Sequence, residues 1–459
     1  MVELPKKAGD AERDCQFDEA FALLGDLFDP IEADELFPVR GNAVYTSCVV
    51  LWMLVYQRMH PDKSLEAAVK HLVGSRLSFL PENKRVKQKT LSSNTSSFSD
   101  ARQRLPREAA EWFSGRISQS LIEASKPTLQ DRRVFLIDGT TMKLAPARAL
   151  QKAFPPAPNQ YGPGVWPVVL LTVAHELSSG AALNPEIGAK FGPEAVSETA
   201  LVKKLLQQMP TGSVVMADAG FGIFAVAHGA AQAGHSFLFR LTQQRFNAYQ
   251  KRATLIEQGE RFKSYELRWQ PSAQELKSHP EIAKDALLQV KLHEVVISPS
   301  LTLLLVSDLR ASAKEMADVY ERRVDVEIDI RNVKVVMNTE QMRVRSVAMF
   351  HKELLLSMVA YNLVTQFRRQ AAELAKRAPR QMSFKRTWTT FRIFLLGAMY
   401  TDPASWREKY QVALRYAMKD KLPNRPAGRQ YEREAYPHRP KANQFKKRKP
   451  PVAEPMTES

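Results

Sequence analysis

The chain has 459 residues, 44% of them hydrophobic and 25% charged, which is ordinary for a soluble globular protein and sufficient for two or three domains. Its formal net charge of +17 and its pI near 9.7 favour a polyanionic partner, although a merely basic soluble protein would have the same balance. No apolar run reaches about 18 residues, so we expect no membrane span, and the first residues lack the apolar core of a secretory signal.

Cysteine and glycine usage narrows the possible chemistry. The two cysteines, Cys15 and Cys48, have neither metal-ligand spacing nor the partners of a disulfide framework. We therefore expect unpaired thiols in a reducing compartment. No glycine-rich loop of the P-loop type is present, and we expect no nucleotide cofactor.

Residues 1–125 are predicted to be helical. Apolar residues recur at helical spacing over 17–28 and 64–72. The most apolar run of the chain, VYTSCVVLWMLVYQRM, starts at Val44 and indicates a buried helix.

The segment 84–107 is dense in Lys, Arg, Ser and Thr. Its hydroxyl residues can cap a helix that carries Arg102 and Arg104, and Pro106 suits the first position of the next helix. Short helices with cations at their junctions are suited to docking on a DNA duplex, which makes Arg102 and Arg104 candidates for DNA binding. A solvated loop between helices explains the same composition equally well.

The middle of the chain changes to a pattern of strands and helices. In chain order we expect strands at 133–144, 166–176 and 181–188, a helix at 194–208, a strand at 214–220, a helix at 223–233 and a strand at 236–241. Three adjacent strands followed by alternating helix and strand describe an α/β sheet with helices on its faces.

Residues 242–312 return to a β pattern, since FKSYELRWQ, LLQVKLHEVVI and LTLLLVSDL are typical of strands with polar turns between them. Helices are expected again from residue 312, and then over 349–375, 388–396 and 406–418.

The tail, residues 421–459, is rich in Pro and carries ten Lys and Arg against four Glu. We expect it to be disordered or to lie along phosphates, and a solubilising tail is the alternative.

One stretch combines residue types that act on phosphates. Tyr320, Arg323, Glu327 and Lys334 are separated by three, four and seven residues. On a helix these positions fall within an arc of about 60°, so one stripe presents a carboxylate between two cations and a phenol. Such a carboxylate can hold a divalent metal while the cations bind a neighbouring phosphate.

The same stretch also fits a strand. Residues 324–330, VDVEIDI, alternate apolar and acidic side chains and are rich in β-branched residues. In a strand, Glu327 would lie beside Asp325 and Asp329 on a solvated face and have no function. Periodicity alone leaves both structures open.

Two aspartates sit where predicted strands end in a turn. Asp138 ends VFLID before GTT, and Asp218 ends VVMAD before AGFG. Ligands meet polar groups at the strand ends of open α/β sheets, although a single such Asp is most often a turn or cap residue. Together with Glu327, Asp138 and Asp218 can hold two divalent ions on either side of a scissile phosphate. Hard oxygen ligands favour Mg²⁺, with Mn²⁺ as a substitute.

These motifs together resemble the DDE transposases of the insertion-sequence-four group. The order is Asp in a DGT turn, Asp in an ADxGF turn, and then the Y-R-E-K spacing, which matches in every interval. The segments SSNTSSFSDARQRLP and FHKELLLSMVAYNLV and the β insertion between the second Asp and the Glu also resemble that family. The resemblance covers about residues 17–399.

The resemblance implies a fold and a role for each motif residue. Asp138, Asp218 and Glu327 would be the metal ligands and catalytic residues of an RNase H-like core. Tyr320, Arg323 and Lys334 would contact phosphates near the cleaved transposon end and help to hold a DNA hairpin, and Arg240 would approach DNA. The resemblance also favours a helix over 314–337.

Three positions depart from the family pattern. Ala219 follows the second Asp where many relatives have Arg, and Val324 stands where an aromatic residue usually follows the motif arginine. Thr302 lies where some relatives carry a Trp that receives a flipped base, while Trp269 lies in an earlier strand.

We expect an α/β fold: an RNase H-like mixed sheet with flanking helices, interrupted by a β-rich insertion, with helical N- and C-terminal regions. The expected domains are a helical DNA-binding domain at 1–125, a catalytic domain at 126–241 and 313–345, the β-rich insertion at 242–312, a helical dimerisation region at 346–420 and a basic disordered tail at 421–459.

The predicted function is that of a DNA transposase. It would bind terminal inverted repeats, excise an insertion sequence by a metal-dependent cut-and-paste reaction through a hairpin, and transfer the cut strand to target DNA. Its partners would be double-stranded DNA and a second copy of the chain, in the bacterial cytoplasm and associated with the nucleoid. The alternatives are a non-mobile nuclease on the same fold and a DNA-binding protein of transposase descent that has lost activity.

Overall fold

The computed structural model describes residues 31–39, 41–74, 80–160, 162–339, 342–398 and 401–422. All of these except Leu422 belong to one unit, Met1–Lys421. The predicted helix over 17–28, Cys15 and most of the basic tail lie outside the described residues.

Five strands form the central part of a mixed sheet. They are β1 (Val134–Lys143), β3 (Gly162–Glu176), β4 (Glu186–Ala189), β5 (Val214–Ala217) and β6 (Ser236–Arg240), in the order β4-β3-β1-β5-β6. β3 runs antiparallel to β1 and β4, while β5 and β6 run parallel to β1. This arrangement confirms the predicted RNase H-like mixed sheet.

The central strands are buried because helices cover them. The apolar starts of β1 and β5, VFLI and VVMA, are buried at every residue, as expected for strands covered on both faces. α9 (Glu198–Leu206) packs on β3 and β4, and α10 (Phe224–Gln232) packs on β6. The predicted strand at 181–188 is shorter than expected, because regular pairing begins only at Glu186.

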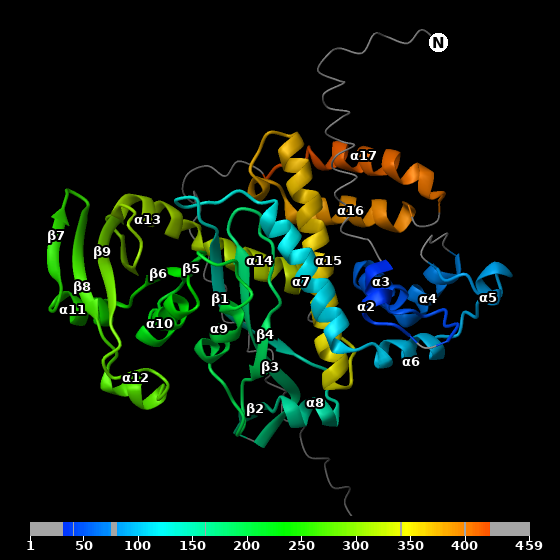
Figure 1. Cartoon of the computed structure of the whole chain (residues 1–459), viewed down its shortest axis with the longest axis horizontal. Coiled ribbons are helices and arrows are strands. Elements are labelled where there is room, and N and C mark those ends of the chain that lie inside the picture. The colour runs from blue at the N-terminus through cyan, green and yellow to red at the C-terminus, as the bar shows by residue number, and fades with distance from the viewer. Residues whose placement is uncertain are drawn as a thin grey trace, which may run out of the picture. The chain divides into compact units, whose positions relative to one another are not determined.

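The β-rich insertion continues the same sheet beyond β6. β10 (Leu301–Ser307) pairs with β6, and β9 (Leu288–Ser298), β8 (Phe262–Trp269) and β7 (Thr254–Gln258) follow, each antiparallel to its neighbour. Figure 1 shows these strands at one end of the sheet. The sequence pattern missed β7, because every residue of this edge strand is exposed and no apolar alternation marks it.

Helices precede the sheet in the chain, as predicted. They are α2 (Ile31–Leu36), α3 (Ser47–Met59), α4 (Leu65–Gly74), α5 (Lys84–Lys87), α6 (Ser96–Arg104) and α7 (Arg107–Glu123). α3 comes from the most apolar run of the sequence and is buried at every position. Pro106 is the N-cap of α7 and not its first residue, one position earlier than expected.

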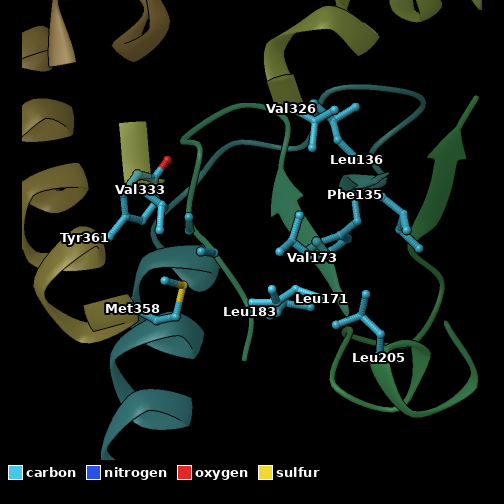
Figure 2. Close-up of a cluster of buried hydrophobic side chains, with 14 of the residues drawn as sticks. Phe135, Leu136, Leu171, Val173, Leu183, Leu205, Val326, Val333, Met358 and Tyr361 are labelled. Carbon is cyan, nitrogen blue, oxygen red and sulfur yellow. The ribbon is translucent and has the colours of Figure 1, made fainter. Parts of the chain in front are cut away.

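The long helix α15 (Val347–Leu374) joins these parts and packs beside α7 (Figure 1). It is the one helix of the described ranges that is long and apolar enough to cross a membrane, but 83% of its apolar window is buried inside the protein. α16 (Phe384–Ala398) and α17 (Trp406–Ala417) pack against it near the C-terminus. Figure 2 shows part of the buried core that α15 shares with the sheet.

Charged groups at the start of α15 hold the N-terminal helices. The carboxylate of Glu353 lies 3.2 Å from a guanidinium nitrogen of Arg58 and 3.0 Å from one of Arg102. Lys352 donates to the carbonyls of Arg102, Gln103 and Leu105, the last ones of α6. Arg102, a predicted DNA contact, therefore has a structural ion pair in this fold, whereas Arg104 is exposed.

Glu353→Ala is expected to lower the free energy of unfolding by about 3 to 5 kcal/mol, because it leaves the buried Arg58 cation without its partner. Urea unfolding of the full chain measures the effect. The matched control is Glu373→Ala, which removes an exposed i,i+4 partner of Arg369 on the same helix and should cost less than about 1 kcal/mol. An equal loss of unfolding free energy in the two variants would show that the Glu353 ion pairs do not stabilise the fold.

Candidate active site

The two predicted aspartates lie at the point where β1 and β5 separate. β1 pairs with β5 only over Val134–Leu136, and it then continues beside β3 to Lys143. Asp138 is therefore in the middle of a strand, and the predicted turn at DGT is wrong: Gly139 and Thr140 remain paired with β3. Asp218 directly follows the end of β5, as predicted.

The stretch that carries Glu327 is helical, so the strand alternative is wrong. α13 (Ala313–Tyr320) starts with a capping box between Ser312 and Glu315. A 3-10 turn (Glu321–Val324), α14 (Asp325–Arg331) and a π-helical segment, η2 (Asn332–Val336), follow without a break. Ile328 is exposed whereas Asp329 is buried, so polarity does not mark the buried face of the helix in the sequence.

The buried face of α14 packs directly on β1. Val326 is fully buried and lies beside Leu136, as Figure 2 shows. Glu327, the next residue, points about 100° away around the helix and is exposed. The contact of α14 with β1 brings Glu327 to the point where β1 and β5 separate, beside Asp138.

Arg323 brings the three carboxylates together. One of its terminal nitrogens lies 2.6 Å from Glu327 Oε1, and the other lies 3.1 Å from Asp138 Oδ2 and 3.5 Å from Asp218 Oδ2. The predicted acids from β1, the end of β5 and α14 thus surround one guanidinium. Arg323 Nε is buried and has no hydrogen-bond partner in the described part of the chain.

The three carboxylates differ in their exposure. The side chain of Asp138 is 17% exposed, compared with 43% for Asp218 and 57% for Glu327. Burial raises the pKa of Asp138 to about 6, although Arg323 and the Gly139 N–H favour its charged form. The Gly139 and Gly220 amides donate to Asp138 and Asp218 and orient both carboxylates.

The other predicted residues of the stripe take different positions. Tyr320 is 5% exposed, and its hydroxyl donates to the carbonyl of Ala217, the residue before Asp218. Burial raises the pKa of Tyr320, so the phenol is a neutral donor. Lys334 Nζ donates to Thr140 Oγ1 and to the Thr141 carbonyl at 3.3 and 2.9 Å. Arg240 is exposed at the end of β6.

Two cations that the sequence did not single out hold the backbone of this region. Arg245 of α11 (Gln243–Gln250) donates to the carbonyls of Ala219 and Gly222, in the loop after Asp218. Lys63 donates to the carbonyls of Met337 and Asn338, just after the π-helical segment. Neither contact leaves a local pattern, because the partners are far apart in the chain.

Gly222 shows how tightly the loop after Asp218 is packed. A Cβ atom at this position would lie 2.3 Å from the carbonyl oxygen of Arg240. Since backbone atoms cannot move aside cheaply, the ADAGFG sequence needs glycine here.

Trp269 does not present its ring to solvent. It is buried in the insertion and packs against Phe224, Phe237 and Tyr249. The residue therefore cannot serve as the exposed aromatic that is missing at Thr302.

The donor set fits a hard divalent cation. Three carboxylates converge on one positive group, and Asp and Glu oxygens are the ligands that Mg²⁺ and Mn²⁺ prefer. The described residues contain no group of three acidic, His or Cys side chains already arranged around a metal position. A metal ion held by these carboxylates would therefore compete with the Arg323 guanidinium.

Comparison with known proteins agrees with this geometry. A family model described as "Transposase DDE domain" matches residues 129–363, just over half of the chain, and the match contains all three acids. The chain belongs to the DDE transposases. Enzymes of this family act on DNA and generally use divalent metal ions.

A curated relative refines the family. The transposase InsG for insertion sequence element IS4, from Escherichia coli (strain K12), is 24% identical over 332 residues, which are 71% of this chain and 73% of the relative. Together with the family match, this similarity confirms a DDE transposase of the insertion-sequence-four group.

Arg323→Gln is expected to strengthen Mn²⁺ binding to the DNA-free transposase by about tenfold or more. A unit charge about 4 Å from a carboxylate is worth on the order of 1 to 4 kcal/mol between water and a protein surface, and tenfold needs about 1.4 kcal/mol. Electron paramagnetic resonance of free Mn²⁺ measures the affinity. Arg331→Gln removes the same charge from an exposed position of α14 and is the control. Equal affinities for the two variants would show that Arg323 does not compete with the metal.

Proposed function

We propose that this transposase binds the terminal inverted repeats of an insertion sequence, cuts the phosphodiester at each 3′ end, and joins the freed 3′-hydroxyl to target DNA. The observation that carries this proposal is the convergence of Asp138, Asp218 and Glu327 around Arg323. Three hard-ligand carboxylates at the point where two interior strands separate suit metal-assisted phosphoryl transfer.

Asp138, Asp218 and Glu327 would hold Mg²⁺, with Mn²⁺ as a substitute. The bound ions would activate a water or 3′-hydroxyl nucleophile and stabilise the leaving oxygen. The amides of Gly139 and Gly220 keep two of the carboxylates oriented for this role.

Arg323 would bind the three carboxylates before DNA binds and a DNA phosphate afterwards. In the DNA-free protein it neutralises the three carboxylates, and a guanidinium released from them is well suited to a bidentate contact with a phosphate. Lys334 would add a second phosphate contact from the same helical stretch. Tyr320 supports the loop that carries Asp218, and with Arg323 and Lys334 it forms the group that we propose for the hairpin step.

Other parts of the chain would bind DNA beyond the cut site. Arg240 and Arg104 are exposed and would approach the duplex, whereas Arg102 would have to leave Glu353 to do so. The basic tail supplies further charge for a phosphate backbone.

We propose a homodimer on DNA, because two ends must be held together for excision. The C-terminal helices α16 and α17 are the proposed interface. A groove between them is lined by the exposed apolar side chains of Ile393, Val412 and Tyr416.

The proposed location is the bacterial cytoplasm, in association with the nucleoid. The proposed reaction needs no nucleotide cofactor, because the 3′-hydroxyl itself is the nucleophile.

Asp138→Asn, Asp218→Asn and Glu327→Gln are each expected to reduce Mg²⁺-dependent cleavage of a matched inverted-repeat end by more than about 100-fold. Even the outer partners of a metal site contribute about 10- to 100-fold, so a ligand should contribute more. Gel analysis of end-labelled DNA measures cleavage and strand transfer.

Asp131→Asn is the matched control, because this exposed residue has φ of +59°, a conformation that Asn also tolerates. Full cleavage by the three active-site variants would refute the assignment. Cleavage without strand transfer by the unaltered chain would instead indicate a nuclease, and metal-independent binding without cleavage would indicate an inactive DNA-binding protein.

A further inference from the structure

Asp325 and Asp329 lie on the face of α14 opposite to Glu327. Residues 325 and 329 are four apart and share one side of the helix, while Glu327 is half a turn from each. Asp329 is 0% exposed. A carboxylate in such a position needs partners, because an unpaired buried charge is strongly destabilising.

Arg380 supplies the main partner from a distant part of the chain. One of its terminal nitrogens lies 2.8 Å from Asp329 Oδ2, and its Nε lies 3.5 Å from Asp325. The same guanidinium donates to the carbonyls of Leu177 and Glu176, in the turn between β3 and β4. Arg380 therefore ties both aspartates of α14 to the sheet.

Further polar groups close the environment of Asp329. The Tyr361 hydroxyl of α15 lies 3.1 Å from Asp329 Oδ1 and 3.0 Å from the Gly180 carbonyl oxygen. His175 Nδ1 lies 3.8 Å from Asp329 Oδ2, and Arg368 donates to the Ser179 carbonyl nearby. Polar groups from the sheet, from α15 and from the segment after α15 thus surround Asp329.

The backbone by itself constrains the rotation of α14 only weakly. α14 has seven residues, and it lies between a 3-10 turn and a π-helical segment. Both flanking geometries have less favourable or less regular hydrogen bonding than an α-helix, and both shift the angle between successive side chains. On the buried side, Val326 contributes packing, and the aspartates contribute directional contacts.

We infer that Arg380, acting through Asp329 and Asp325, is a positioning residue for Glu327. It holds α14 at the rotation that turns Glu327 toward Asp138 and Asp218. This inference rests on the proposed role of Glu327 as a metal ligand. Arg380 itself stays behind the helix, away from the reacting atoms, so its effect on the reaction passes through the orientation of Glu327.

The test compares two double variants of the full-length transposase. Asp329→Asn with Arg380→Gln removes both charges of this ion pair together, so neither member of the pair is left as an unpaired buried ion. Arg369→Gln with Glu373→Gln is the control. It removes an ion pair that joins two residues near the end of α15. Each protein is titrated with Mn²⁺ by electron paramagnetic resonance, and its thermal unfolding is recorded.

The expected result is a rise of about tenfold in the Mn²⁺ dissociation constant for the Asp329/Arg380 variant and no change for the control, as for other partners that orient metal ligands. Arg380→Lys keeps the charge but loses the fork that spans two aspartates and two carbonyls, so it should retain only part of the affinity. A purely structural role would lower the unfolding temperature and leave the dissociation constant unchanged, and this result would overturn the inference.

Two further variants keep the outcomes distinct. If the Asp329/Arg380 variant does not fold, Asp325→Asn and Arg380→Lys are tested instead with the same criterion, because both retain the Asp329 carboxylate and a cation.

Glu327→Gln separates the inference from the proposed function. If it binds Mn²⁺ like the unaltered chain, the metal-ligand assignment is wrong; if it binds weakly while the Asp329/Arg380 variant does not, only the positioning role is wrong.

Discussion

The site depends on one electrostatic constraint: three carboxylates from separate parts of the chain share one guanidinium. Like charges at short range repel, so Asp138, Asp218 and Glu327 can stand together only around a cation. In the DNA-free transposase Arg323 is that cation. In the proposed function the same carboxylates would hold divalent ions, and Arg323, once released from them, would be free to bind a phosphate.

The helix that carries Glu327 is charged on both faces. On one side, Arg323 joins Glu327 to Asp138 and Asp218, and behind the helix Asp329 is bound by Arg380. The 3-10 and π-helical flanks mean that these contacts, more than helix length, hold its orientation. Lys63 extends this support to the N-terminal helices, because it binds the carbonyls where the π-helical segment ends. The N-terminal helices and the stretch that carries Glu327 are thus physically connected.

Most of the architecture was accessible from periodicity and composition. β1, β3, β6, α10 and the C-terminal helices were predicted close to their observed bounds, since each has a clear apolar pattern, whereas β4 and β5 are shorter than predicted. β7 was missed because it is an exposed edge strand, and the turn at DGT was wrong because β1 continues beside β3 after leaving β5. The helix at Glu327 needed the family resemblance, because VDVEIDI satisfies a strand and a helix equally well.

By itself, the sequence indicated the α/β class of fold, the three acids and the spacing of the residues around Glu327, since these follow from local pattern and residue type. Only the tertiary structure decided which cation pairs with each buried or clustered acid. Arg323 lies among all three, Arg380 lies behind the helix at Asp329, and Arg102 is engaged by Glu353. The physical reason is that periodicity records how neighbouring residues share a face, whereas buried ion pairs are formed by packing between residues that are remote in the chain.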